Sequence, residues 1–298
     1  MDENRPFLET QCLGIIEAMD MPAQLHRVSL PFFWQMLPLW LTPNLLPKVR
    51  STPKPLKFPL PSFVICGGKV ALKMGAYLKK KNKTFAVALK GNPSFFHKVI
   101  IESDEQEEKE NTIHTLGPVH RVHPEVLLSA RTKFYRKIDT FSKPRVGVFL
   151  EGSESLDPLI EILRSLHKKT PFSLMIHGKT LSEEKKQQLT LEEIPHLLWN
   201  GQGENPYLGF LAHAEAIIVS NRSSLMVAEA TAAGLPLFIY PSCSPDSYVQ
   251  TLIQKGYASL LTSHSFLFSS SVLPPLQETH RVAHILKQAY VDIRRGFL

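Results

Sequence analysis

The stretch VGVFLEGSESLDPLIEILRSLHKKTPFSLMI, residues 146–176, decides the fold because an apolar run stands on each side of a helical segment. We expect strands over Val146–Leu150 and Phe172–Ile176, joined by a helix over Leu156–Lys168. The same alternation continues downstream. It predicts an α/β fold in which a parallel sheet is covered by helices on both faces and ligands bind at the carboxyl ends of the strands.

The rest of the second half repeats this unit. The expected strands and helices are a helix over Ser182–Leu189, a strand over Leu197–Trp199, a short helix over Pro206–Ala212, a strand over Ala216–Ser220, a helix over Ser223–Ala233, a strand over Leu235–Tyr240, and helices over Asp246–Lys255 and Glu278–Asp292. The last helix could pack back across the boundary between the two halves.

The first half is less regular but of the same class. We expect helices over Thr10–Met19, Lys69–Lys80 and 123–138, and strands over Ser62–Cys66, Phe85–Leu89 and Val99–Glu102. A hinge at Ser142-Lys143-Pro144 then divides an acceptor-side and membrane-side domain, residues 1–141, from a ligand-binding domain, residues 142–298. Two α/β units joined by a hinge predict a cleft between them.

Charge is distributed unevenly along the 298 residues. The net charge of +7 lies in the first half, where residues 21–101 carry 13 Lys/Arg and no Asp/Glu. Such a run indicates an anionic partner. Cys12, Cys66 and Cys243 lack metal-ligand spacing and cannot all pair, which favours a reducing compartment without a zinc site. The acidic opening MDENRPFLET is unlike a signal peptide, so we expect an intracellular protein.

Glycine and small polar residues follow several predicted strands. They are Gly67-Gly68-Lys69, Gly152-Ser153, Gly178-Lys179-Thr180, Gly201 with Gly203, and Ser223-Ser224. Free backbone N–H groups at such turns suit a phosphate, although a single turn of this kind is usually plain α/β construction. Arg222 and Glu229 lie seven positions apart on one helix face, where they could meet a diphosphate and a ribose. The alternative is an unpartnered surface pair.

Residues 199–242, WNGQGENPYLGFLAHAEAIIVSNRSSLMVAEATAAGLPLFIYPS, resemble the signature of the elongated-mitochondria (mitochondrial fission) family. TLGPVHRVHPEVL (115–127), PSFVICGGKVA (61–71) and ETQCLGIIEAM (9–19) extend the resemblance over nearly the whole chain. Bacterial members of this family are described as glycosyltransferases of GT-B fold. The resemblance therefore implies two Rossmann-like domains and a nucleotide-sugar donor held mainly by the second.

On this resemblance a set of residues in the second half would bind the donor, without a cofactor or a metal ion: Gly152, Ser153, Lys179, Gly203, Glu204, Asn205, Tyr207, Arg222, Ser223, Ser224 and Glu229. Gly67, Gly68, Lys69 and Arg121 would lie on the acceptor side. No DxD motif is present, as is usual for GT-B enzymes.

The general base is sought among the histidines of the first half, because an imidazole can take a proton from an acceptor hydroxyl. His97, His114, His120 and His123 are the candidates. We favour His120, which stands in the family's HRV stretch, with Asp2 as a second candidate. A lone histidine is more often a hydrogen-bonded structural residue.

Three features depart from the family pattern. No apolar strand with a glycine-rich turn precedes the first helix, the phosphate turn reads Glu151-Gly152-Ser153 rather than Gly-Gly, and Arg222 replaces an acid. A glutamate beside a diphosphate is unfavourable unless it turns away or is protonated. The missing strand and Glu151 favour a non-enzymatic alternative that follows the plant members of the family, a peripheral membrane adaptor that recruits a dynamin-like GTPase, whereas the retained Glu229 and GENPY turn oppose it.

The stretch VSLPFFWQMLPLWLTPNLLPK, residues 28–48, is as long as a membrane span, but its four prolines would break a spanning helix. Core burial or a subunit contact is possible. We favour a surface that rests on an anionic membrane, because tryptophan suits interfaces and cations follow the aromatics. The contact residues would be Phe32, Phe33, Trp34, Trp40, Lys48 and Arg50.

These observations lead to one hypothesis with two rivals. The chain is expected to be a glycosyltransferase, peripheral on the inner face of a membrane, that moves a sugar from a nucleotide-sugar to a cell-envelope glycolipid. The rivals are the membrane adaptor and a nucleotide-sugar epimerase, which would share the donor site. A nucleic-acid partner is not expected, because no RNA-binding motif accompanies the basic run.

Overall fold

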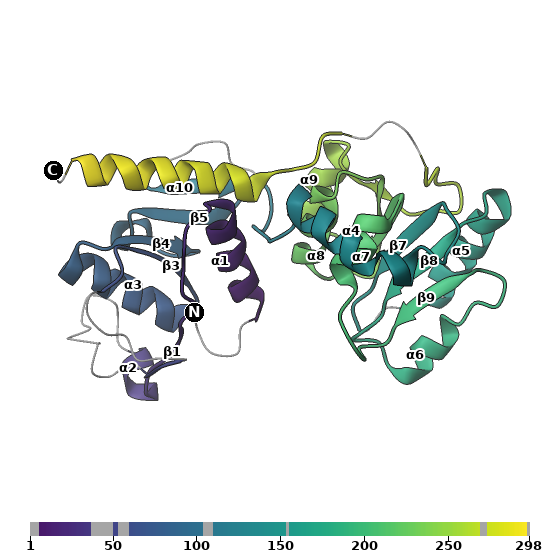
Figure 1. Ribbon diagram of the computed structural model, residues 1–298, viewed down its shortest axis with the longest axis horizontal. Coiled ribbons are helices and arrows are strands. Elements are labelled where there is room, and N and C mark those ends of the chain that lie inside the picture. Colours follow the sequence, from purple (N-terminus) through teal and green to yellow (C-terminus); the bar gives the residue numbers. More distant parts are fainter. Residues whose placement is uncertain are drawn as a thin grey trace. The chain divides into compact units, whose positions relative to one another are not determined.

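The computed structural model describes residues 6–36, 50–52, 60–103, 110–152, 155–268 and 273–296. It divides into two compact units, one made of residues 1–121 and 278–298 and the other of residues 122–277. Each unit is built on a parallel sheet with helices on its faces (Figure 1). The predicted α/β class with two Rossmann-like units is confirmed.

Unit 2 contains a six-stranded sheet in the order β12-β11-β10-β7-β8-β9, in which every pair is parallel. The strands are β7 (Arg145–Phe149), β8 (Ser173–His177), β9 (His196–Trp199), β10 (Ala216–Ser220), β11 (Leu237–Tyr240) and β12 (Ser259–Leu260). Strands β7 to β9 run outward in one direction and β10 to β12 in the other. The order therefore reverses between β7 and β10, which is the topological switch point of a doubly wound sheet.

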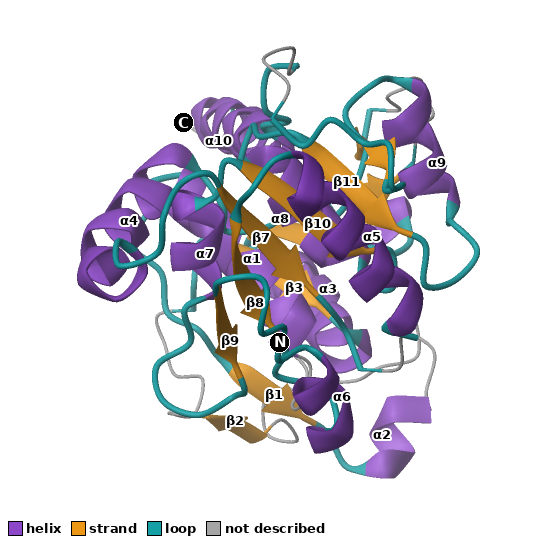
Figure 2. Cartoon of the chain, turned by 90° about the vertical axis from the view of Figure 1, so that its right-hand side faces the viewer, coloured by secondary structure: helices purple, strands orange, loops and turns teal. Residues whose placement is uncertain are grey.

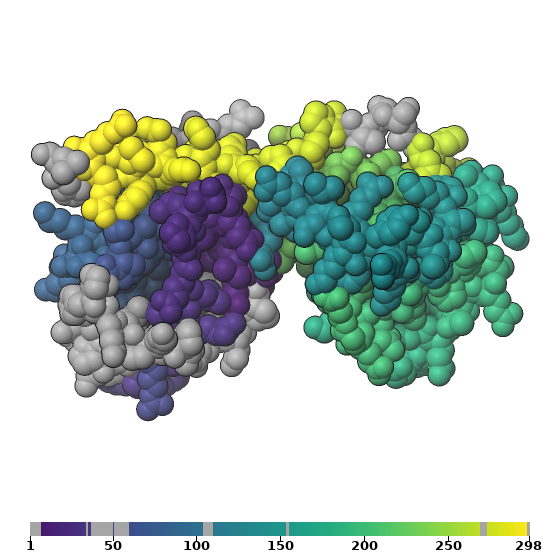
Figure 3. All heavy atoms as spheres, viewed as in Figure 1, coloured from purple at the N-terminus to yellow at the C-terminus, as the bar shows by residue number. Residues whose placement is uncertain are grey.

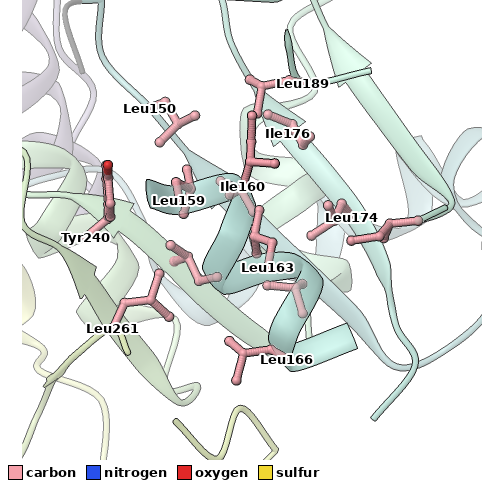
Figure 4. Packing of buried hydrophobic residues seen from close by; sticks show 14 of the residues in the cluster. Leu150, Leu159, Ile160, Leu163, Leu166, Leu174, Ile176, Leu189, Tyr240 and Leu261 are labelled. Atoms are coloured by element: carbon pink, nitrogen blue, oxygen red, sulfur yellow. The ribbon is translucent and has the colours of Figure 1, made fainter. Parts of the chain in front are cut away.

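Six helices of unit 2 accompany this sheet: α4 (Pro124–Ile138), α5 (Asp157–Lys169), α6 (Glu183–Gln188), α7 (Tyr207–His213), α8 (Ser224–Ala232) and α9 (Ser247–Gln254). In Figure 2, α4 and α7 lie at one side of the strands of this unit and α5 lies at the other side. On α5, Leu159, Ile160, Leu163 and Leu166 are buried. Their spacing puts them on one face of the helix, and Figure 4 shows them directed onto the sheet.

Helix α4 belongs to unit 2, so the division falls between Arg121 and Val122 and not at the hinge predicted near residue 142. The reason is close packing of α4 on α7. Gly209 lies so near Phe134 that a Cβ atom there would stand 2.7 Å from the ring. His213 Nε2 also lies 2.9 Å from the carbonyl oxygen of Arg131.

Unit 1 contains a four-stranded parallel sheet in the order β3-β4-β5-β6 and a two-stranded antiparallel ladder, β1-β2. Its elements are α1 (Pro6–Ala18), β1 (Arg27–Ser29), α2 (Phe32–Met36), β2 (Arg50–Thr52), β3 (Phe63–Gly67), α3 (Lys69–Asn82), β4 (Phe85–Leu89), a 3₁₀ turn (Pro93–Phe95), β5 (Lys98–Glu102), β6 (Thr112–Thr115) and α10 (Glu278–Arg295).

Helix α10 packs on α1 and on one face of the unit 1 sheet. In Figure 3 the yellow atoms of the C-terminal segment lie against the purple atoms near the N-terminus. Val282, Ala283 and Leu286 join the same buried cluster as Ile15 and Met19. The last helix thus returns to the first unit, the arrangement considered from the sequence.

Candidate functional site

The carboxyl ends of the unit 2 strands form one edge of its sheet. Phe149 on β7 is in register with His177 on one side and with Val219 on the other. The residues that follow these three positions, among them Glu151 and Asn221, consequently emerge at the same edge. This edge includes the switch point between β7 and β10, where open α/β sheets bind their ligands.

Helix α8 begins at this edge. Ser223 caps it by accepting a hydrogen bond from the Met226 N–H at 3.4 Å, and Ser224 Oγ donates to Asp246 Oδ2 at 3.0 Å. Arg222, just before the cap, is exposed. A capped helix start beside an exposed guanidinium is favourable for an anion.

Tyr207 and two glutamates come together at this edge. Burial raises the pKa of Tyr207 well above its ordinary value, and the neighbouring carboxylates of Glu229 and Glu151 raise it further. The Tyr207 hydroxyl is buried and makes no hydrogen bond of normal geometry within the described residues, although the Glu229 carboxylate interacts with it. Glu229 itself is only 8% exposed. The structure therefore presents a buried hydroxyl donor in the neighbourhood of two carboxylates.

His177, which was not among the predicted site residues, packs in the same place. Its ring lies 4.7 Å from the centroid of Trp199, 5.2 Å from Tyr207 and 6.3 Å from Phe149. Burial lowers the pKa of His177 to about 4, and the nearby Asn205 side chain opposes this only in part. Neither ring nitrogen is hydrogen-bonded with normal geometry in the described part of the chain. The imidazole is thus neutral at pH 7 and has unused polar atoms.

Asn221 was also missed from the sequence, and it organises the loop after β11. Its buried amide donates to the Cys243 carbonyl at 2.7 Å and accepts from the N–H groups of Ser242 at 2.9 Å and Cys243 at 3.1 Å. The loops after β10 and β11 are thereby held together next to the start of α8. A single asparagine in SNRSS carries no spacing signal that could have revealed this role.

The predicted phosphate turn after β7 is already engaged. Gly152 has φ +60°, donates its N–H to Thr180 Oγ1 at 2.9 Å, and its carbonyl accepts from Lys185 Nζ at 3.3 Å. Ser153 lies outside the described residues. Lys179 is exposed beside Gly201. The turn thus joins the β7 and β8 loops in the present arrangement.

The GENPY turn leads into α7. Gly203 has φ +70°, and Asn205 Oδ1 accepts from the Tyr207 N–H at 3.0 Å, which fixes the start of the helix. Glu204 forms an exposed ion pair with Lys133 of α4. The Tyr207 side chain interacts with Glu151 and Glu229, and the Asn205 side chain lies near His177.

The predicted residues of unit 1 form a separate set. Gly67 ends β3, and Gly68, with φ 94°, precedes the exposed Lys69 at the start of α3. His120 is 3% exposed, and both its N–H and its carbonyl bond to Thr279 Oγ1, at 2.9 and 3.0 Å. Arg121 donates two hydrogen bonds to Glu17. Asp2 lies outside the described residues.

The aromatic stretch contains a short helix that its irregular pattern did not predict. On α2, Phe32, Phe33 and Met36 are 77%, 67% and 71% exposed. Arg50 is exposed on β2, whereas Trp40, Lys48 and the side chain of Trp34 lie outside the described residues.

Among the described helices, none is long and apolar enough to cross a membrane. No group of three or more His, Cys, Asp or Glu side chains in the described residues could hold a metal ion.

Two known structures resemble the chain at low sequence identity. The glycosyltransferase SnogD from Streptomyces nogalater is 14% identical, with 78% of this chain and 69% of that chain covered and a TM-score of 0.44. UDP-GlcNAc 2-epimerase from Neisseria meningitidis is 12% identical, with 77% and 70% covered and a TM-score of 0.44.

Sequence relatives are more informative. The mitochondrial fission protein ELM1 of Arabidopsis thaliana is 23% identical over 199 residues, which cover 59% of this chain and 44% of the relative. An uncharacterised protein of Rickettsia prowazekii is 32% identical over 90 residues, or 28% of this chain and 25% of the relative. The matches thus span less than half the length of these curated relatives. The family model for mitochondrial fission ELM1 matches residues 8–290, and the chain belongs to this family.

Proposed function

We propose that the chain is a glycosyltransferase that binds a nucleotide-sugar donor at the carboxyl edge of the unit 2 sheet. The observation that carries the proposal is the buried Tyr207 hydroxyl near Glu229 and Glu151, beside a neutral His177, where neither the hydroxyl nor the ring nitrogens make a hydrogen bond of normal geometry within the described residues. Buried polar atoms without partners cost free energy, and a ligand rich in hydroxyl groups would supply those partners.

The donor would lie across this edge in a defined direction. Its diphosphate would meet the capped start of α8 and Arg222, where the helix dipole favours negative charge. Glu229, within the second turn of that helix, would accept hydrogen bonds from ribose hydroxyls. Glu151 would accept from hydroxyls of the sugar, and not lie against the diphosphate, where its charge would be unfavourable.

Chemistry on this donor would need no bound metal or cofactor. Arg222, Lys179 and the N–H groups at the start of α8 would stabilise the charge that develops on the leaving diphosphate. A base would take the proton of the acceptor hydroxyl as the new glycosidic bond forms at the anomeric carbon. His120 is the candidate for this base, with Asp2 as the second. Gly67, Gly68, Lys69 and Arg121 would lie on the acceptor side.

The acceptor is proposed to be a cell-envelope glycolipid presented at the inner face of a membrane. The exposed Phe32, Phe33 and Met36 of α2 support this, since aromatic and apolar side chains exposed together favour an interface. Residues 21–101 add 13 cations without an acid, and such a run attracts anionic lipids.

The test is to add nucleoside diphosphates and nucleotide-sugars to the protein and to measure binding by the shift in its thermal unfolding. A ligand present at 100 times its dissociation constant should stabilise the protein by about 2.7 kcal/mol. We expect one nucleotide class to do so, and Glu229→Gln to remove the effect. Glu161→Gln, an exposed glutamate on α5, is the matched control and should keep it. If no nucleotide shifts the unfolding of folded protein, the donor site is wrong.

A second candidate function rests on α2 and on the family. The matched Arabidopsis relative is a mitochondrial fission protein, and a membrane adaptor would use the exposed face of α2 without a donor site. Vesicle binding without nucleotide binding would favour the adaptor. The third candidate, an epimerase, would bind the nucleotide-sugar and convert it without transfer to any acceptor.

A further inference from the structure

A polar cluster lies at the carboxyl edge of the unit 1 sheet, where β5 ends at Glu102. Gln11 of α1 is only 3% exposed and donates through Nε2 to Glu102 Oε1 at 3.4 Å. Lys90, the residue after β4, donates through Nζ to the other carboxylate oxygen at 3.1 Å. The carboxylate is thus held from two sides, while 25% of the Glu102 side chain stays exposed. None of these three residues belongs to the proposed donor-binding or acceptor-side set.

Thr115 of β6 brings a buried hydroxyl to the same place. It is the register partner of Glu102 on the neighbouring parallel strand. Two residues earlier, Ile100 and Ile113 lie in one buried cluster. Side chains two apart in a strand share a face, so Glu102 and Thr115 point to the same side of the sheet. Thr115 is 1% exposed, and its Oγ1 makes no hydrogen bond in the described part of the chain. A buried hydroxyl without a partner costs free energy.

The backbone at Lys90 adopts an uncommon conformation. Three non-glycine residues in the described ranges have positive φ, and two of them, Asp20 and Lys83, stand where helices end, a usual place for it. Lys90 instead follows a strand, with φ 58°, and its N–H donates to the Ile100 carbonyl at 3.0 Å. Strain of this kind clusters at ligand-binding and active sites. Here it accompanies the placement of the Lys90 ammonium against Glu102.

The charges of this cluster select the kind of ligand. Glu102 and Lys90 neutralise each other, so neither an anion nor a cation gains a net attraction. The carboxylate keeps lone pairs for further donors, and hydroxyl groups form strong hydrogen bonds to a carboxylate. The Thr115 hydroxyl can donate and accept. Because neighbouring strands lie about 4.8 Å apart, adjacent hydroxyl groups of one sugar ring can reach both side chains.

We propose that Glu102, Lys90 and Thr115 form a carbohydrate subsite in unit 1. It lies at the carboxyl ends of parallel strands, where α/β sheets bind their ligands. Glu102 accepts from the sugar hydroxyls, Lys90 donates to a sugar oxygen, and Thr115 bonds to a neighbouring hydroxyl. As a site for the acceptor's sugar, the inference rests on the proposed function. As a site that binds a sugar, it is independent of the donor.

The experiment is saturation-transfer NMR on the full chain with a panel of free sugars: glucose, galactose, mannose and N-acetylglucosamine. We expect at least one sugar to bind, and Glu102→Gln to lower its affinity by about tenfold or more, because the bonds to the carboxylate are charge-assisted. Glu110→Gln, an exposed glutamate just before β6, is the matched control and should bind as the wild type does. Thr115→Val keeps the shape of a side chain whose hydroxyl is unbonded, so it should fold normally and bind about threefold to tenfold more weakly.

The outcomes separate this subsite from the donor site. If no sugar binds to folded protein, or if binding survives both Glu102→Gln and Thr115→Val, the subsite is wrong. If Glu229→Gln removes binding while the unit 1 variants keep it, the sugar occupies the donor site, and only the subsite is overturned. Sugar binding that depends on Glu102 in a protein that binds no nucleotide would support the subsite and overturn the proposed function.

Discussion

The rings of His177 and Tyr207 pack edge to face, with their centroids 5.2 Å apart and their planes at 78°. This contact joins the end of β8 to the start of α7 and excludes water from both polar groups. It also ties the protonation of His177 to the packing of the candidate site, because an imidazolium would be charged inside an aromatic cluster.

Acid should therefore destabilise the protein through His177. Its pKa is about 4 when folded and ordinarily 6.5, so the unfolded chain binds more protons between these values. Stability should be fully present above about pH 6.5 and fall by up to about 3 kcal/mol as pH drops to about 4. His177→Gln should flatten this part of the curve, measured by urea unfolding across pH. His97, whose pKa is also lowered to about 4, is unchanged in the variant, so the difference between the two curves isolates His177.

Tyr207→Phe should separate stability from binding. Because the hydroxyl makes no hydrogen bond of normal geometry, its removal should leave the free energy of unfolding unchanged or raise it by up to about 1 kcal/mol. Nucleotide affinity should fall by about tenfold, the loss of one hydrogen bond to the ligand. A loss of stability above about 1 kcal/mol would instead mean that the hydroxyl bonds to Glu229 in the free protein.

Gly209→Ala should destabilise unit 2 by about 1–3 kcal/mol, since a Cβ atom 2.7 Å from the Phe134 ring forces α7 and α4 apart. Urea unfolding would measure this. Shortening the opposing side chain in Gly209→Ala/Phe134→Leu should recover part of the loss, because the two sites are in direct contact. If the double variant loses as much stability as Gly209→Ala and Phe134→Leu lose together when measured singly, the steric explanation is contradicted.

The sequence was sufficient for much of this architecture where strands are buried on both faces. Ala216–Ser220 and Phe85–Leu89 were predicted with their observed bounds, since both are short apolar runs between turn residues. Strand β6 was not predicted, because its sequence, TIHT, contains no such apolar run. The domain boundary was missed because the position of α4 depends on Gly209 meeting Phe134, a contact between residues far apart in the chain.

The site was predictable to the extent that it follows motifs. Tyr207 and Glu229 were predicted through the family stretch, and in the structure Glu229 and Glu151 both interact with Tyr207, while their role in binding stays a prediction. His177 and Asn221 were not found, because their roles arise from neighbours in space: an aromatic cluster around one and the Cys243 loop around the other. Neither role leaves a spacing signal in the sequence.

Asn221→Ala should release the loop after β11 and cost about 1–3 kcal/mol, because the backbone groups of Ser242 and Cys243 lose the hydrogen bonds that the buried Asn221 amide makes with them. Cys243 is exposed, and its thiol should react faster with a thiol reagent once the loop is free. Cys12 and Cys66 are buried and serve as internal controls. An unchanged rate at Cys243 together with unchanged stability would show that Asn221 does not hold this loop.

Membrane association should depend on α2. Burying one phenylalanine in an interface contributes about 1.5–3 kcal/mol, so Phe32→Ser/Phe33→Ser should lower binding to anionic vesicles by at least about tenfold. Co-sedimentation with vesicles containing phosphatidylserine measures this, and neutral vesicles should bind more weakly because they offer no anionic lipid to the cations of residues 21–101. Phe266→Ser is the matched control, since Phe266 is 86% exposed in unit 2. If Phe266→Ser weakens binding as much as the α2 substitutions do, the aromatic surface of α2 is not the membrane contact.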